Sequence, residues 1–192
     1  MLMWSLPRSL DYLPRKRMAG ISMVEGLMSI VIVSFGLLGL AALQGRATNA
    51  ELESYQRGQA LILLQDMVNR IENNPAHIEK YITADKPAGM DAAKADCRNL
   101  PSRAETDLCE WGKLLRDTSG SSNNHALGEM IDARGCIEAT GSEREYRVSV
   151  VWQGLGNTTA PTGTNCGEGL YESEESRRAV TSIIVIPDLA GL

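Results

Sequence analysis

The chain is poor in the residues that most often build catalytic and metal sites. Its 192 residues include two histidines and nine aromatic side chains, only one of them a phenylalanine. The four cysteines lie 12, 27 and 30 positions apart, whereas structural zinc motifs pair cysteines two to four residues apart. The net charge of −5 disfavours a non-specific nucleic-acid binder, which usually carries a basic face. We therefore expect no enzyme activity, no metal, no cofactor and no nucleic-acid partner.

The remaining polar motifs have ordinary structural explanations. His77 and His125 stand without a cysteine or serine placed as a nucleophile, which favours solvated or structural roles. The acidic cluster at 172–175 could hold calcium, but a solvated face is the usual meaning of such a run. The Gly154-Leu155-Gly156 stretch lacks the strand–helix context of a dinucleotide site and reads as a turn. A membrane-tethered enzyme is an alternative class of function, and it would require a cluster of polar side chains in a pocket of the C-terminal region.

Charge is almost absent from residues 21–43, where Glu25 is the single ionisable side chain. As a helix, these 23 residues would reach about 34 Å, enough to cross a hydrocarbon core of roughly 30 Å. Residues 1–20 carry four basic side chains and one acidic one, including the block at 15–17, so the rest of the chain carries −8. This asymmetry predicts a transmembrane segment over 21–45 with its N-terminus in the cytoplasm.

Two processing events could act on this N-terminal segment. A secretory signal would be cut after small residues, and Ala41-Ala42 imitates such a site weakly, but the apolar run is long and continues into further helix. The other event would be cleavage before the apolar run, and Glu25 is the residue that raises it. A carboxylate in a spanning helix costs on the order of 2.5–3.5 kcal/mol and usually has a function. A residue that snorkels to the headgroups is the structural alternative.

The residues around Glu25 form a specific pattern: a basic leader ends in Gly20, an apolar residue follows, and Glu25 lies five positions beyond the glycine at the start of the apolar run. This pattern resembles the class III signal of type IV prepilins and type II secretion pseudopilins. The resemblance implies a leader over 1–20 that prepilin peptidase removes between Gly20 and Ile21, with N-methylation of Ile21. It also implies that Glu25 serves in assembly, as a partner for its own terminus or that of a neighbouring subunit. The helix-breaking proline of many major pilins is missing here.

The second half of this helix is predicted to be amphipathic over 46–74. An apolar stripe should contain Leu52, Tyr55, Ile62, Met67 and Ile71, flanked by Leu61, Leu64 and Val68. Pro75 disfavours helical geometry at Asn74 and should end the helix. A periodic run from 21 to 73 is longer than an ordinary globular helix, and it suggests a stalk with a domain packed on its far end.

The C-terminal region is predicted to combine one short helix with strands. The spacing of Ser102 and Glu105 fits a capping box before a helix over 103–117, and helical turns are expected at 77–82. Strands are expected at 127–133, 136–139, 144–153 and 178–186, the last apolar enough to be central, with loops at 84–101, 118–124 and 154–169. A long N-terminal helix on a small antiparallel sheet is an α+β fold, and it matches the type IV pilin fold with about four strands.

The four cysteines lie on the outer side of the membrane in this topology, where disulfides form. Four cysteines allow three pairings. We favour Cys97–Cys109 together with Cys136–Cys166, because this pairing closes the shorter loops.

The C-terminal region more loosely resembles the PilV-type minor pilins, through Trp111, Leu114-Leu115 and the segment 147–152. This resemblance implies a minor pilin in the bacterial inner membrane, with a periplasmic head over 75–192, that enters the pilus and helps to prime its assembly for twitching motility and adhesion. The implied partners are prepilin peptidase, other minor pilins, the major pilin, the inner-membrane assembly machinery and the lipid bilayer. A minor pseudopilin of type II secretion and a DNA-uptake pilin are the alternatives.

Overall fold

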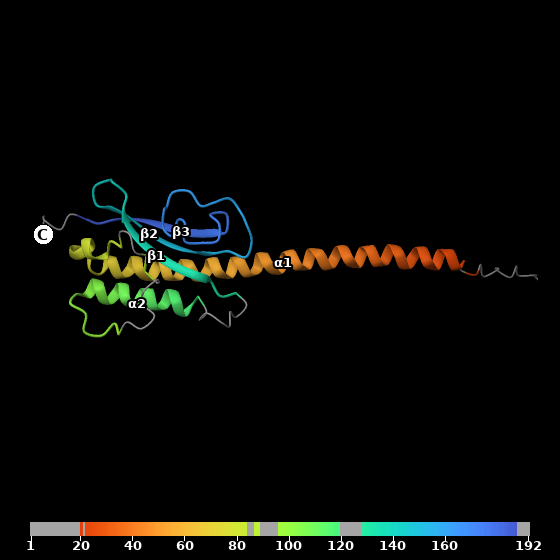
Figure 1. Ribbon diagram of the computed structural model, residues 1–192, viewed down its shortest axis with the longest axis horizontal. Helices are drawn as coiled ribbons and strands as arrows, with labels where there is room; N and C mark the ends of the chain where they lie inside the picture. Colours follow the sequence, from red (N-terminus) through yellow and green to blue (C-terminus); the bar gives the residue numbers. More distant parts are fainter. Residues whose placement is uncertain (1–19, 21, 84–86, 89–95, 120–127, 188–192) are drawn as a thin grey trace, which may run out of the picture. The chain divides into compact units, whose positions relative to one another are not determined.

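A computed structural model of the chain describes residues 20, 22–83, 87–88, 96–119 and 128–187. The residues divide into two compact units, Met1–Gln44 and Gly45–Leu192. The first described helix, α1, extends over Met23–Glu72 and so contributes to both units. The other elements all belong to the second unit and are listed here in chain order: η1 (Pro75–Tyr81), α2 (Arg103–Asp117), β1 (Ile131–Ala139), β2 (Glu145–Gln153) and β3 (Arg177–Val185) (Figure 1). The fold is α+β, as expected, and it is consistent with a type IV pilin.

The buried side of α1 in the second unit differs from the predicted stripe. The buried residues follow steps of three and four and are Gln56, Ala60, Leu63, Leu64, Met67, Val68 and Ile71. Tyr55 and Ile62 were expected inside, but they are 55% and 70% exposed. The buried stripe is therefore rotated around the helix axis relative to the predicted one. Gln56 lies in the core, a position that its polar side chain did not predict. Its amide nitrogen donates to the Glu129 carbonyl at 2.8 Å, and its amide oxygen accepts from the Trp152 indole at 3.3 Å.

The two short helical elements lie where the sequence predicts them. The α1 helix ends at Glu72, and Pro75 opens the 3₁₀ helix η1. Helix α2 covers the predicted residues 103–117, and the Ser102 hydroxyl accepts from the Glu105 amide at 3.3 Å as an N-cap. Trp111 and Leu115 on the predicted apolar face are fully buried.

Within the described residues, the sheet has three antiparallel strands in the order β1-β2-β3, whereas about four were expected. The two weak strand predictions at 127–133 and 136–139 correspond to the single strand β1, which begins at Ile131, while residue 127 lies outside the described residues. Pairing with β2 shifts between Ile131 and Arg134, where Asp132 has a φ of 51°. The predicted gap at Arg134 and Gly135 is instead part of the regular pairing, opposite Val151 and Val150 of β2.

The strand β3 is paired on one side only, although its apolar sequence suggested a central position. Among the described strands it pairs with β2 from Arg177 to Val185 without any register shift. Its Val180 and Ile184 side chains are buried, whereas Ile183 and Val185 are 56% and 68% exposed. Hydropathy could not distinguish this edge strand from a central one, because apolar residues stand on both of its faces.

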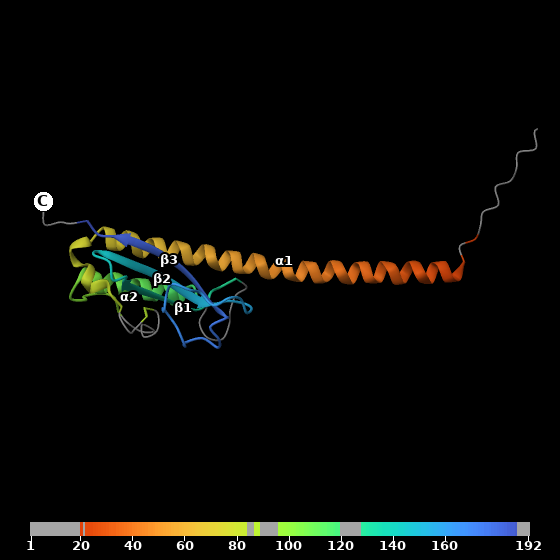
Figure 2. The same ribbon diagram turned by 90° about the horizontal axis from the view of Figure 1, so that it is seen from above.

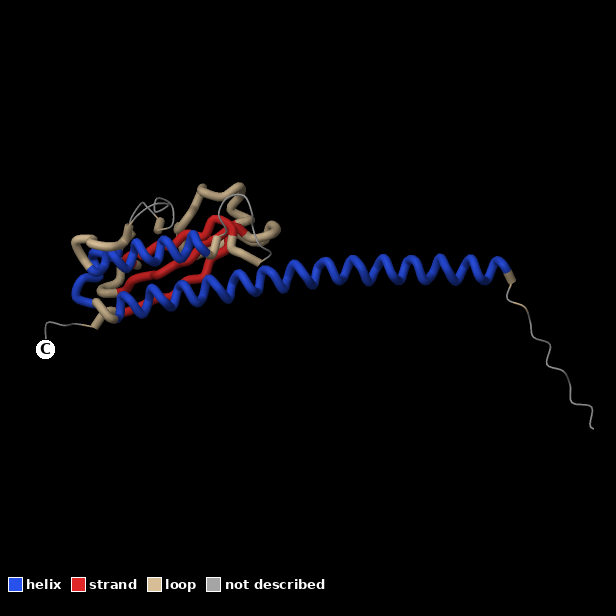
Figure 3. The backbone as a smooth tube through the Cα atoms, turned by 90° about the horizontal axis from the view of Figure 1, so that it is seen from below, coloured by secondary structure: helices blue, strands red, loops and turns tan. Residues whose placement is uncertain are grey.

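The core of the second unit lies between the sheet and the two helices. Buried residues of α1, α2, η1 and all three strands form one apolar cluster. Figure 3 shows α2 beside the second half of α1, with the strands against both. The Trp111 indole nitrogen links the two helices by donating to the Leu63 carbonyl at 2.9 Å. A second, smaller cluster lies on the opposite face of the sheet, where Cys136, Val151 and Cys166 are buried with Tyr171 and Ala179 packed against them.

Candidate functional site

In the first unit, the apolar side chains of α1 are not covered by any other described residue. The large apolar side chains from Met23 to Leu43 are 48–88% exposed. By length and composition this helix could cross a membrane, and none of its most apolar window is buried. An apolar surface of this size needs lipid or other protein helices around it, because exposed patches on soluble monomers rarely exceed a few hundred Å².

The expected processing residues lie just before this helix. Gly20 is exposed, and a side chain added there would meet nothing within 4 Å. Ile21, the expected methylated residue, lies outside the described residues. The helix begins at Met23, and the Gly26 amide donates to the Ser22 carbonyl at 3.1 Å. The chain before Met23 is therefore open to another molecule at Gly20.

Glu25 is the acidic residue in the first turn of α1 and is exposed. An acidic side chain at this place interacts favourably with the positive end of the helix dipole. Its backbone carbonyl accepts a hydrogen bond from the Ser29 hydroxyl at 2.8 Å. Within the described part of the chain, the carboxylate has no hydrogen bond or ion pair, so its charge is available to a group from outside that part.

In the second unit, a polar network joins α1 to α2. Arg70 donates to Asp66 at 2.9 Å, to the buried Asp107 at 3.1 Å and to Glu110 at 2.7 Å. Asp107 also accepts from the Tyr81 hydroxyl at 2.6 Å. A surface cavity of about 580 Å³ opens beside these residues. The network pairs three carboxylates with an arginine, so it stabilises the packing of the helices and offers no free base or nucleophile.

The pKa values of Tyr81 and Tyr171 are both raised by their surroundings. Burial, and next the hydrogen bond to Asp107, raises the pKa of Tyr81 to about 12. Burial also raises the pKa of Tyr171, whose hydroxyl donates to the Asp132 carbonyl at 3.0 Å. The Arg134 guanidinium lies 5.3 Å from the centre of the Tyr171 ring, within the range of a cation–π contact. Both phenols therefore remain protonated and act as structural donors.

The connection between β2 and β3 is held against the sheet by a buried arginine. The Arg177 side chain is 4% exposed, and it donates to the Thr164 carbonyl at 3.2 Å and the Cys166 carbonyl at 3.1 Å. Glu174 completes the arrangement by accepting from Arg177 at 2.7 Å and from the Gly169 amide at 2.7 Å. Sequence reasoning missed Arg177, because an arginine at the start of a strand usually remains in solvent.

The structure contains the disulfides Cys97–Cys109 and Cys136–Cys166, with Cα–Cα distances of 5.6 and 5.8 Å. The first bond joins the segment before α2 to α2 itself. The second bond joins β1 to the β2–β3 connection, and its two cysteines, Cys136 and Cys166, are each 2% exposed. The second bond therefore fixes the long irregular β2–β3 connection to a strand.

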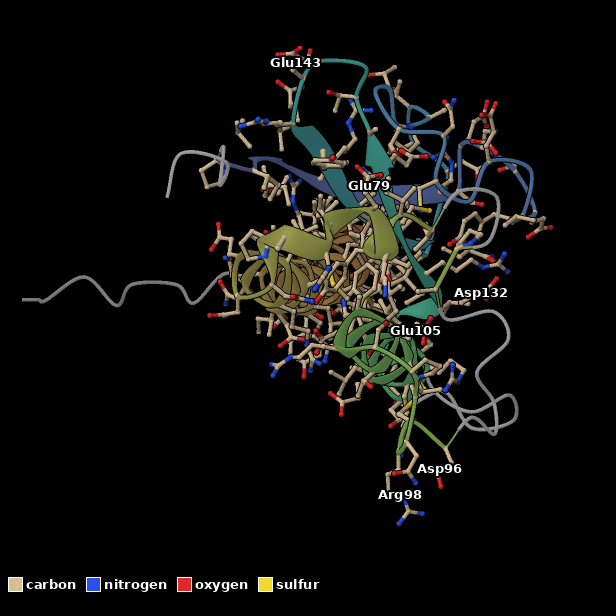
Figure 4. All side chains as sticks on the ribbon, turned by 90° about the vertical axis from the view of Figure 1, so that its left-hand side faces the viewer. Glu79, Asp96, Arg98, Glu105, Asp132 and Glu143 are labelled. Atoms are coloured by element: carbon tan, nitrogen blue, oxygen red, sulfur yellow. A yellow bond between two sulfur atoms is a disulfide. The ribbon has the colours of Figure 1, made fainter. Side chains whose placement is uncertain are left out.

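The other residues that the sequence raised for chemistry are dispersed. His77 is exposed on η1, and His125 lies outside the described residues. Glu174 is bonded as described above, and the Gly154 amide donates to the Ser176 carbonyl at 2.8 Å in a turn after β2. Figure 4 shows charged residues such as Glu143, Asp96 and Arg98 pointing outward from the second unit. The described residues contain no group of three or more His, Cys, Asp or Glu side chains that could hold a metal.

Comparison with known proteins relates this arrangement to pilins. Residues 42–112 match the model of the family of the type IV pilin Tt1218. The match covers the second half of α1, η1 and most of α2, which is less than half of the chain. No curated protein and no solved structure matches the chain significantly. Together with the exposed apolar helix and the small antiparallel sheet, the family match supports a type IV pilin-like protein.

Proposed function

We propose that this type IV pilin-like protein is a minor pilin, cut after Gly20 by prepilin peptidase and methylated on Ile21. Before assembly it is held in the bacterial inner membrane by the apolar half of α1, with residues 75–192 in the periplasm. It then enters the pilus with other minor pilins and the major pilin, and it helps the inner-membrane machinery to start the filament. Twitching motility and adhesion are the processes that this role serves.

One observation carries the proposal: an uncovered apolar helix with a single carboxylate, Glu25, in its first turn. Cleavage after Gly20 would create an ammonium group at Ile21, four residues before Glu25. Within a membrane, two opposite charges gain from pairing because each is costly when alone. If the ammonium group belongs to a neighbouring subunit, the pair fixes the register between the two helices during assembly.

A minor rather than a bulk subunit is supported by the first half of α1. The helix continues through 41–42, where many major pilins have a proline, without a break. Bulk subunits must adapt their helices throughout the filament, whereas a subunit that starts the filament has fewer neighbours. The Trp111 helix and the strand at 147–152 also resemble PilV-type minor pilins.

The second candidate is a minor pseudopilin of a type II secretion system. The same N-terminal signal and the same Glu25 favour it, because the two systems share these features. Deleting the gene separates the candidates. Loss of surface pili and twitching with normal exoenzyme levels supports the pilin, and the opposite pattern supports the pseudopilin.

The experiment that tests the proposal compares Glu25→Ala and Glu25→Gln with the wild-type protein in cells. Mass spectrometry of the membrane-extracted wild-type protein should find a methylated Ile21 terminus. Both variants should be inserted and cleaved but should enter sheared pili poorly, since the charge is lost in each. Glu143→Ala is the matched control, because it removes one carboxylate from an exposed turn of the second unit (Figure 4).

Two results would overturn the proposal. A terminus near residue 43 would identify a secreted protein without a membrane helix. Normal incorporation of both Glu25 variants into pili would show that the carboxylate has no role in assembly.

A further inference from the structure

The outer edge of β3 presents backbone groups that have no partner in the described chain. The Ile186 amide donates to the Arg144 carbonyl at 2.9 Å, and the Gly154 amide donates to the Ser176 carbonyl at 2.8 Å. These bonds continue the β2–β3 register, so even-numbered residues of β3 form the hydrogen-bonded pairs with β2. In an antiparallel ladder the alternate residues direct their N–H and C=O groups away from the partner strand. Thr181, Ile183 and Val185 therefore direct these groups to the free edge.

The opposite edge of the sheet is occupied by the chain itself. The Ala133 amide donates to the Ser119 hydroxyl at 2.9 Å. Gly135 exchanges two backbone hydrogen bonds with Ala88, at 2.7 and 3.0 Å. The Ile137 carbonyl accepts from the Thr83 amide at 3.1 Å, and its amide donates to the Thr83 hydroxyl at 3.0 Å. The sheet is thus protected at β1, and within the described residues it is open at β3.

The β3 edge also lacks the usual features that prevent strands from pairing. Natural edge strands are commonly short, bulged, or carry lysine or proline. β3 has nine residues and pairs with β2 without a shift, and residues 179–186 contain no charged side chain and no proline. Ile183 and Val185 add apolar surface beside the free backbone groups, since both are more than half exposed. A long, regular and apolar edge of this kind is a template for another strand.

We propose that the free edge of β3 binds an extended segment of a different polypeptide, which adds a fourth strand to the sheet. The backbone groups of Thr181, Ile183 and Val185 would supply the hydrogen bonds. The segment should carry uncharged, preferably β-branched side chains at alternate positions, because its neighbours on the outer face are Thr181, Ile183 and Val185 and none can compensate a charge. The inference goes beyond the proposed role in pilus assembly. The free edge belongs to the second unit alone, and only the choice of a different polypeptide over a second copy also rests on the proposed membrane anchor.

A second copy of this chain fits the edge less well than a different polypeptide. Its β1 edge is occupied, so two copies could join only through β3. Figure 2 shows β3 running alongside the second half of α1, and Arg178 at its start bonds Glu53 of α1 at 3.0 Å. Antiparallel pairing of two β3 strands would therefore turn the two helices in opposite directions. Residue 45, where the second unit begins, would then lie at opposite ends of the paired units in the two copies. Two proteins that are anchored in the same membrane cannot adopt this arrangement.

The test is photo-crosslinking of the full-length protein in cells, with benzoylphenylalanine placed in turn at positions 181, 183 and 185. Leu155, an exposed apolar residue in the β2–β3 connection, is the matched control position. We expect all three edge positions to label one segment of one other protein, at sites spaced by two residues, as a strand ladder requires. The control position should not label that segment.

Two pairs of variants test whether backbone pairing is responsible. Thr181→Pro removes an N–H that makes no bond to β2, whereas Thr181→Val keeps it, so only the proline variant should lose the adduct from position 185. Val185→Lys should also lose the adduct from position 181, and Leu155→Lys should keep it. Thermal unfolding of each purified variant identifies any that fails to fold. If Thr181→Pro does not fold, the comparison of Val185→Lys with Leu155→Lys tests the proposal.

Adducts formed only with a second copy of the chain, labelling scattered over unrelated sites, or no adduct from the edge in the folded protein would each overturn the proposal. So would an adduct that survives both Thr181→Pro and Val185→Lys. These measurements do not involve cleavage at Gly20 or the Glu25 variants, so failure here leaves the proposed function standing.

Discussion

The indole nitrogen of Trp111 donates a hydrogen bond to the carbonyl of Leu63 at 2.9 Å, which joins α2 to α1 across 48 positions of the sequence. The same ring lies on the backbone of β1, where a Cβ added at Gly135 would come within 2.1 Å of its Cη2 atom. The side chain is fully buried, so it has no space into which to move. One tryptophan therefore sets the spacing between both helices and the sheet.

Gly135→Ala should lower the free energy of unfolding by about 1–3 kcal/mol, because the new methyl group overpacks a closed core. Urea unfolding of the full-length protein in detergent, followed by tryptophan fluorescence, measures the change. Gly58→Ala is the control, since a Cβ there meets nothing within 4 Å in the middle of α1. That variant should raise stability by about 0.5–1 kcal/mol. Equal stability of Gly135→Ala and the wild type would contradict this account of the core.

Local sequence patterns were sufficient for the short elements of this fold. The Ser102–Glu105 spacing located the start of α2, and the alternation from Tyr146 to Trp152 located β2, because caps and alternation depend on residues close in sequence. Pro75 likewise marked the end of α1. Glu25 was found as the only charge in an apolar run, a signal that needs no tertiary information.

The failures concern contacts between distant segments. Gln56 is buried because Glu129 and Trp152 supply its hydrogen bonds, and neither lies near it in sequence. Arg177 is buried because the carbonyls of Thr164 and Cys166 turn toward it. The edge position of β3 follows from the strand order β1-β2-β3 of the described residues, which no property of the β3 sequence reveals.

Arg70→Ala should cost about 1–3 kcal/mol of stability, because it removes the guanidinium that hydrogen-bonds the buried carboxylate of Asp107. That carboxylate then keeps only the Tyr81 hydroxyl and a looser 3.6 Å ion pair with the largely exposed Arg103. The Asp107 side chain is only 5% exposed, so water cannot replace the guanidinium fully. Arg98→Ala is the control: Arg98 and Asp96 form a 2.8 Å pair whose side chains are 86% and 60% exposed. Its removal should leave the unfolding curve unchanged. Equal effects of the two arginine variants would show that the Arg70 network is as weak as a surface pair.

The stability of the second unit should fall as the pH rises from about 10 to about 12. The pKa of Tyr81 is raised to about 12 in the folded protein, whereas a tyrosine in the unfolded chain titrates near 10. The folded state thus binds the phenolic proton more tightly, and this stabilisation is complete below pH 10 and lost as the pH approaches 12. Unfolding free energies measured across this window should vary less in Tyr81→Phe. Tyr171 acts in the same direction, so Tyr171→Phe is measured beside it, and a pH dependence that survives both substitutions would refute the assignment.

Removing the two disulfides should have unequal effects. In the chain-entropy model, Cys136–Cys166 closes a 30-residue separation and should contribute about 4 kcal/mol, against about 3 kcal/mol for the 12-residue separation of Cys97–Cys109. The paired variants Cys136→Ala with Cys166→Ala and Cys97→Ala with Cys109→Ala test this order by urea unfolding.

Accessibility predicts that the disulfide with the smaller contribution to stability is also the first to be reduced. Cys97 and Cys109 are half-exposed, whereas Cys136 and Cys166 are buried beneath the β2–β3 connection, so a mild reductant should open Cys97–Cys109 first. Peptide mapping without reductant, and then after timed alkylation, measures both the pairing and the order of opening. A Cys97–Cys166 link, or earlier opening of Cys136–Cys166, would show that the connection does not shield the sheet as the Arg177 contacts indicate. The bond that contributes more to stability should therefore also be the one that resists reduction longer, but for a different reason: its contribution follows from its longer loop, and its resistance follows from burial beneath the β2–β3 connection.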